Sequence, residues 1–183
     1  MIRYLSRTVR RLCVVAVVGA SLFAATQLGA TAASAANGKP ARLAIPDWQQ
    51  AFDFSAGSAC RFELAGTPVS NSQYIKLYPT DANGDTRQLV NGILTLQLTN
   101  VGTGKSIIVN VSGPATLINH ADFSVDANLG GSALVAFIAP FNPRGPATYI
   151  YTGHTVLSFN TFGLLTLVST TDSKPFDVCA ALS

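Results

Sequence analysis

The segment at residues 100–106, NVGTGKS, ends in GTGKS, the pattern that closes a phosphate-binding loop. The complete motif is G-x-x-x-x-G-K-[ST] followed directly by a helix, because the loop amides and the helix N-terminus hold the phosphates. Here Thr99 stands where the first glycine is required, and the alternating stretch SIIVNVSG follows Lys105. The segment therefore predicts a β-hairpin with Gly102 and Gly104 in its turn and Lys105 in solvent. We expect no nucleotide partner.

A second motif, DANGDT, spaces Asp81, Asn83 and Asp85 like the first ligands of a calcium loop. Such a loop needs glycine at its sixth position and a bidentate glutamate at its twelfth, where this chain has Thr86 and Gly92. Asn83-Gly84 is also one of the strongest signals for a hairpin turn. The turn is the preferred interpretation, and weak calcium binding stays open as the alternative.

Histidine chemistry is limited to His120, in NHAD, and His154, in TGHTV. Together with Asp122 they could form a metal or hydrolytic site, but their spacing matches no zinc motif and no G-x-S-x-G serine is present. We therefore expect no catalytic, cofactor or metal-binding residues. The alternative is an extracellular hydrolase with a dispersed site, which requires His120, Asp122 and His154 to converge in one cleft.

Aromatic side chains suggest a binding surface. Tyr149 and Tyr151 in TYIYTG share one face of a strand, and Ile150 lies on the other. If Ile150 faces the core, the tyrosines point outward and could contact a sugar or a protein, although the opposite assignment stays open. Trp48 and the nearby phenylalanines are expected to be in or near the core.

Residues 1–35 have the three parts of a secretory signal peptide. Arg3, Arg7, Arg10 and Arg11 precede the apolar run 12–25, and the Ala-Ser-Ala at 33–35 fits a cleavage site. This run is shorter than the ~20 residues of a spanning helix, so we expect no stable membrane anchor after cleavage. The choice between general and twin-arginine export stays open.

Cleavage would leave residues 36–183, with eight Lys and Arg against nine Asp and Glu, a net charge of −1. This near-neutral balance gives no electrostatic basis for binding nucleic acid. The two remaining cysteines, Cys60 and Cys179, lie near opposite ends of that chain. Because exported proteins fold under oxidising conditions, we expect them to form one disulfide.

The rest of the chain must position these residues, and its pattern is that of an all-β protein. Alternating apolar stretches are separated by turn residues every eight to twelve positions, as in NGILTLQLTN and KSIIVNVSG. Further strands are expected in ACRFELAG, QYIKLYPT, GSALVAFIAP, ATYIYTG, HTVLSFNT, LLTLVSTT and PFDVCAAL, and PDWQQAF is expected to hold a short helical turn. We predict a single-domain antiparallel β-sandwich, Ig-like or jelly-roll-like, over 43–183, after a flexible tail at 36–42.

GSACRFEL, LTNVGTGKSIIVNVSGP and the terminal DVCAAL resemble a group of small secreted proteins of high-GC actinobacteria. The resemblance implies an all-β sandwich with a cysteine near each end, and it implies no activity. The sequence thus leads us to expect a secreted or cell-wall-associated, non-catalytic protein that binds an extracellular protein, a glycan or the cell envelope. A carrier of small apolar ligands is a further alternative.

Overall fold

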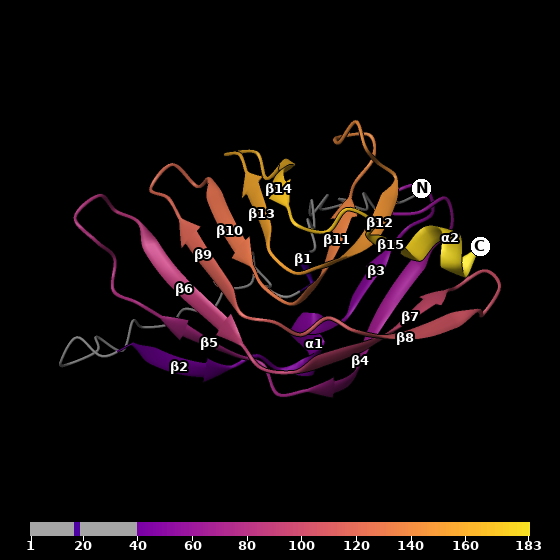
Figure 1. Ribbon diagram of the computed structural model, residues 1–183, viewed down its shortest axis with the longest axis horizontal. Helices are drawn as coiled ribbons and strands as arrows, with labels where there is room; N and C mark the ends of the chain where they lie inside the picture. Colours follow the sequence, from indigo (N-terminus) through magenta and orange to yellow (C-terminus); the bar gives the residue numbers. More distant parts are fainter. Residues whose placement is uncertain (1–16, 19–39) are drawn as a thin grey trace, which may run out of the picture.

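The computed structural model describes residues 17–18 and 40–183, and its regular secondary structure is mostly antiparallel strand, with two short helices (Figure 1). The strands are β1 (Val17–Val18), β2 (Ala41–Ala44), β3 (Phe52–Phe54), β4 (Leu64–Asn71), β5 (Tyr74–Leu77), β6 (Thr86–Asn91), β7 (Leu94–Asn100), β8 (Ser106–Asn110), β9 (Ala115–Asn119), β10 (Val125–Leu129), β11 (Ser132–Phe137), β12 (Ala147–Thr152), β13 (Thr155–Phe159), β14 (Leu165–Thr170) and β15 (Phe176–Asp177). The helices are α1 (Asp47–Gln50) and α2 (Val178–Leu182).

The strands form three sheets, and the strand numbers run in one direction across each sheet. The largest, sheet B, has the order β14-β13-β10-β9-β6-β5-β2, sheet C has β3-β4-β7-β8, and sheet A has β1-β11-β12-β15. The chain adds hairpins alternately to sheet B and to sheets C and A. Each long stretch that runs through a corner, such as β6 followed by β7, therefore pairs with the stretches before and after it, and the connectivity is a meander of bent strands. In Figure 1, sheet B occupies the left and upper middle, and sheets A and C occupy the right.

Short corners join the two sides of this meander. Each corner turns one long stretch of extended chain from one sheet into the next, as between β6 and β7. Gly92 forms that corner with a φ of +121°, and a side chain there would place its Cβ 2.5 Å from the Ser72 carbonyl oxygen. At the next pair of corners a side chain on Gly113 would collide with the Gly130 carbonyl. Glycine therefore allows the corners to touch, which bends the meander into a sandwich.

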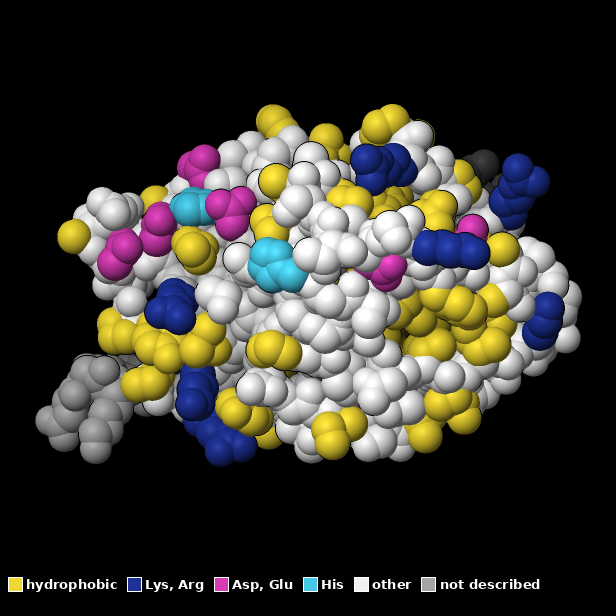
Figure 2. Space-filling model, viewed as in Figure 1, with side chains coloured by type: hydrophobic (Ala, Val, Ile, Leu, Met, Phe, Trp, Pro, Cys, Tyr) yellow, Lys and Arg dark blue, Asp and Glu magenta, His cyan; other side chains and the backbone are white. Residues whose placement is uncertain are grey.

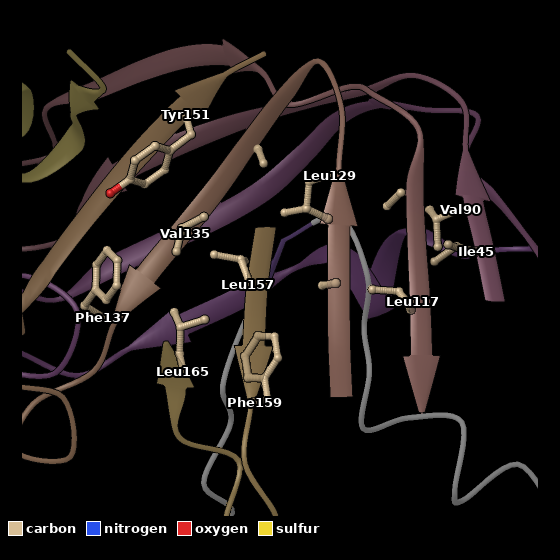
Figure 3. Close-up of a cluster of buried hydrophobic side chains, with 13 residues drawn as sticks. Ile45, Val90, Leu117, Leu129, Val135, Phe137, Tyr151, Leu157, Phe159 and Leu165 are labelled. Atoms are coloured by element: carbon tan, nitrogen blue, oxygen red, sulfur yellow. The ribbon is translucent and has the colours of Figure 1, made fainter. Parts of the chain in front are cut away.

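Sheet A lies between two hydrophobic cores, because alternate residues of β11 face different clusters. Val135 and Phe137 belong to the cluster shared with sheet B, whereas Leu134 and Ala136 belong to the cluster shared with sheet C and α2. Figure 3 shows the first cluster, with side chains from β11 and β12 of sheet A directed toward those of β9, β10 and β13 of sheet B. Both faces of β11 are thus buried, and this strand links the two cores.

The C-terminus is fixed by a disulfide and a capped helix. Cys60 and Cys179 are bonded across 119 residues of chain, with their Cα atoms 5.5 Å apart, and Cys60 is fully buried. This confirms the predicted disulfide. The expected strand in PFDVCAAL is wrong beyond Asp177, because that carboxylate accepts a hydrogen bond from the Ala180 amide and caps α2.

The predicted all-β antiparallel sandwich with one disulfide is confirmed. The short helical turn begins after Pro46, as predicted. Ala41 and Arg42, at the end of the predicted tail, lie in β2 and pair with Leu77 and Lys76 of β5. The predicted signal peptide and its cleavage site lie outside the described residues, except that the backbone of Val17 and Val18 pairs with β11.

Candidate functional site

His120 is held between two carboxylates at one end of sheet B. It lies in the turn between β9 and β10, a hairpin that the sequence analysis did not identify. Its Nδ1 is 3.0 Å from an oxygen of Asp85, just before β6, and its Nε2 is 3.3 Å from an oxygen of Asp126 in β10. The hydrogen bonds to Asp126 and then to Asp85 raise the pKa of His120 above its ordinary value. An ionised carboxylate only accepts hydrogen bonds, so this arrangement favours the imidazolium with both nitrogens protonated.

The carboxylates of the DANGDT segment are used within the β5–β6 hairpin. One Asp81 oxygen accepts hydrogen bonds from the Asn83 and Asp85 amides, and Gly84 has a positive φ of 87°. Asp85 in turn binds His120 and accepts from the Ala121 amide. The hairpin turn is confirmed, and it is wider than two residues. The described residues contain no group of three His, Cys, Asp or Glu side chains placed to hold a metal ion.

The three residues of the hydrolase hypothesis have separate partners. Asp122 accepts hydrogen bonds from the amide and the hydroxyl of Ser124, which lower the pKa of its carboxyl group. His154, at the start of β13, bonds through Nε2 to the side chain of Asn128. Within residues 40–183, no hydrogen bond or ion pair joins His154 to His120 or Asp122. The three side chains therefore have different hydrogen-bonding partners in the structure.

Both histidines instead border the outer face of sheet B, the face that points away from the core. Asp126 and Asn128 are exposed on β10, while Ala127 between them is buried. Their cross-strand neighbours on this face include Ile118 in β9 and Ser158 in β13. Figure 2 views this face and shows histidine side chains and a group of acidic side chains on it. The outer face of sheet B thus has exposed side chains on β6, β9 and β10, and both histidines lie beside it.

A second group on the same face, the cationic patch, lies on β2, β5 and β6. It consists of Arg42, Tyr74, Lys76, Tyr78 and Arg87. The Arg42 guanidinium lies 3.8 Å from the centre of the Tyr74 ring, and the Arg87 guanidinium lies 5.1 Å from that of Tyr78. In Figure 2 basic side chains gather beside hydrophobic ones at the lower left, where Figure 1 places β2 and β5. The sequence analysis missed this patch, although the alternation of Tyr74, Lys76 and Tyr78 could have indicated it.

The predicted tyrosine surface on β12 is not an outer surface. Tyr151 is only 5% exposed and Tyr149 is half-buried, and both pack with Phe137 in the core between sheets A and B. Burial also raises the pKa of Tyr151. The two tyrosines do share a face, but Ile150 on the opposite face is buried as well. The outward orientation is therefore wrong, because β12 belongs to the middle layer.

The prediction for Trp48 is wrong in the opposite direction, since this side chain is exposed. It was expected in or near the core, but it lies on α1 and is 69% exposed. Phe54 is buried as expected, and Phe52 and Phe62 are partly buried against the core of sheet C.

The GTGKS segment forms the turn of the β7–β8 hairpin, as predicted. Asn100 closes the turn: its side-chain oxygen accepts from the Gly102 and Thr103 amides, and its carbonyl accepts from the Gly104 amide. Gly104 has a positive φ of 74°, and Lys105 is exposed and donates to the Ser183 carbonyl oxygen. A strand, not a helix, follows the lysine, so the geometry of a phosphate-binding loop is missing here.

Comparison with protein-family models, with curated proteins and with solved structures finds no match to this chain. Among the described residues, neither helix has the length and apolar character needed to span a membrane.

Proposed function

We propose that this protein is a secreted, non-catalytic binding protein that contacts an extracellular partner or the cell envelope through the outer face of sheet B. The observation that carries the proposal is the composition of that face. The inner faces of all three sheets are filled by core side chains, whereas this face presents aromatic, cationic, acidic and amide groups on adjacent strands. A rigid sheet that holds many polar side chains in register is suited to recognising an extended ligand.

The state of His120 favours binding over hydrolysis. A general base needs a free ring nitrogen within reach of the proton that it removes. Both nitrogens of His120 face carboxylates, and its raised pKa favours the protonated form. His154, the other histidine of the hydrolase hypothesis, is bonded to Asn128. For these reasons we do not put forward the hydrolase as a second candidate.

Export from the cytoplasm is supported by two independent features. The first 35 residues have the pattern of a signal peptide, and Cys60 and Cys179 form a disulfide in the structure. Disulfides of this kind persist in oxidising surroundings. N-terminal sequencing of the protein recovered from culture medium is expected to begin at Ala36.

A pull-down experiment tests the proposal. It measures how much of the exported protein is retained on isolated cell envelopes and on components of the culture supernatant. The Thr116 side chain lies near the middle of the outer face, where its neighbours are Leu89 and Asn128. Thr116→Arg and Thr116→Glu should each reduce retention roughly tenfold or more, because either side chain is too large for a ligand lying flat on the sheet.

Ile108 supplies the matched control. It is 66% exposed on β8, in sheet C, so Ile108→Arg and Ile108→Glu should leave retention unchanged. Circular dichroism would check that all four variants fold. Equal retention of the Thr116 and Ile108 variants would contradict the proposed surface, and no retention of the unmodified protein would contradict the proposed function.

A further inference from the structure

We propose that the cationic patch binds the carboxylate groups of an acidic polysaccharide. This inference rests on the proposed function and deepens it by naming the class of ligand. The side chains that carry it lie on β2, β5 and β6.

The first support is a charge imbalance built into the pairing of the strands. Arg42 and Lys76 are direct cross-strand partners, and Arg87 lies on the next strand of the same sheet. Like charges directly opposite each other destabilise a sheet. Within residues 40–183 none of these three side chains forms an ion pair with Asp or Glu, since both ion pairs found there involve His120. The patch therefore has unbalanced positive charge that an anionic ligand would neutralise.

The second support is the orientation of the two guanidinium groups. Arg42 stacks on Tyr74 and Arg87 stacks near Tyr78. Stacking restricts the conformations of each arginine and leaves the N–H donors at the edge of the guanidinium plane. In the described part of the chain, neither guanidinium donates a hydrogen bond to a protein oxygen. Two partly ordered guanidinium groups with free donors suit bidentate binding of planar carboxylates.

The third support is the mixture of apolar and cationic side chains. Leu89 is the cross-strand partner of Lys76, and Ile118 is the partner of Arg87. Leu89 is half-buried and Ile118 is exposed, both on the outer face. Sugar rings have apolar faces and can pack on such side chains, whereas a chain of bare phosphates cannot. The combination therefore favours a polysaccharide that carries carboxylates over a simple polyphosphate.

The acidic group around His120 limits where such a ligand could run. Asp126 is the cross-strand partner of Ile118 on the side away from Arg87, and Asp85 precedes β6. These carboxylates would repel an acidic chain. The polysaccharide is therefore expected to follow β2, β5 and β6 and not to cross the sheet toward β10.

Titration of the exported protein with polygalacturonate, by calorimetry at low salt, tests this inference. Dextran serves as the neutral polymer and inorganic polyphosphate as the phosphate polymer. Replacing the three patch cations together, Arg42→Gln, Lys76→Gln and Arg87→Gln, should weaken polygalacturonate binding roughly 10- to 100-fold, at up to about 1 kcal/mol per exposed ion pair. Added salt should also weaken binding.

The control replaces three exposed cations elsewhere, Arg61→Gln, Lys105→Gln and Lys174→Gln, and so removes the same charge. This variant should bind polygalacturonate as the unmodified protein does. Equal weakening in both variants, or equally tight binding of dextran or polyphosphate, would overturn the inference. If retention on cell envelopes depends on Thr116 but not on the patch cations, the polysaccharide inference fails and the proposed function stands. If retention depends on neither, the proposed function fails as well.

Discussion

His120 gains its properties from residues that are distant in the sequence. Asp85 and Asp126 come from different hairpins, and the meander places β6, β9 and β10 side by side so that both carboxylates reach the same imidazole. The side chain of His120 is 31% exposed, so each ion pair is screened by water and is worth less than about 1 kcal/mol. The ion pairs of His120 with Asp85 and Asp126 nevertheless make the stability of this end of sheet B depend on pH.

We predict that His120→Gln destabilises the protein below neutral pH and has little effect at alkaline pH. The folded protein raises the pKa of His120, so the stabilisation is fully present below the ordinary imidazole pKa of about 6.5 and is lost as the pH rises through the raised value. Urea denaturation at several pH values would measure this, with an expected difference of up to about 1 kcal/mol near pH 5. A difference that stays constant or grows with pH would contradict the prediction, as would an NMR titration of His120 with a midpoint below 6.5.

Single residues were predictable from the sequence where their chemistry is independent of the fold. Cys60 and Cys179 were paired correctly because they are the two cysteines left after the predicted leader. Whether His120, Asp122 and His154 converge was left open by the sequence, because it does not report which strands are neighbours. The real partners, Asp85, Asp126 and Asn128, required the register of sheet B.

At the scale of elements, some hairpins were predictable from the sequence and others were not. The β7–β8 hairpin was predictable because its strands alternate cleanly and glycines mark its turn. The strand β10 was missed because Asp126 and Asn128 occupy its outward positions, which lowers its β propensity. Tyr149 and Tyr151 show a further limit: alternation separates the two faces of a strand, but it does not tell whether one face or both are covered.

The corner at Gly92 gives a test of the bent meander. Gly92→Ala should destabilise the protein by more than the ~1–2 kcal/mol that a left-handed conformation costs an ordinary residue. The added Cβ would also lie 2.5 Å from a backbone oxygen of Ser72. Gly57 also has a positive φ, and a Cβ there would have no atom within 4 Å, so Gly57→Ala should show the conformational cost alone. Equal losses in urea denaturation would mean that the corners are not in close contact.

At the scale of the whole molecule, β11 joins the two cores into one cooperative structure. Leu134 and Val135 are neighbours in the chain, yet their side chains lie in different clusters and both are buried. Removing packing from one core should therefore weaken the attachment of the other. The sandwich was predictable from the sequence but its middle layer was not, since the burial of both faces of β11 depends on how the sheets stack.

We predict that Leu134→Ala lowers the free energy of unfolding by about 2–5 kcal/mol and leaves a single transition. Far-UV and near-UV circular dichroism should give the same midpoint during denaturation, because loss of one core unfolds both. Ile118→Ala, on the outer face of sheet B, should cost much less. Two separate transitions in the Leu134 variant would show that the cores unfold independently.

The disulfide is expected to contribute strongly to stability. Its 119-residue separation corresponds to roughly 4–5 kcal/mol in the chain-entropy description of the unfolded state. Replacing both cysteines, Cys60→Ala with Cys179→Ala, should therefore lower the midpoint of unfolding substantially. Ellman titration of the unmodified protein under denaturing, non-reducing conditions should find neither thiol free. Two free thiols per chain, or an unchanged midpoint in the double variant, would contradict this role.

The same bond encloses five hairpin turns, at residues 78–85, 101–105, 120–124, 138–146 and 160–164, within one covalent ring. A protease that cuts the chain once in any of these turns opens the ring without releasing a fragment. The two pieces remain linked through Cys60 and Cys179, and each strand stays near its partners. A nicked molecule would thus keep its surface, and the damage would become visible only on a reducing gel.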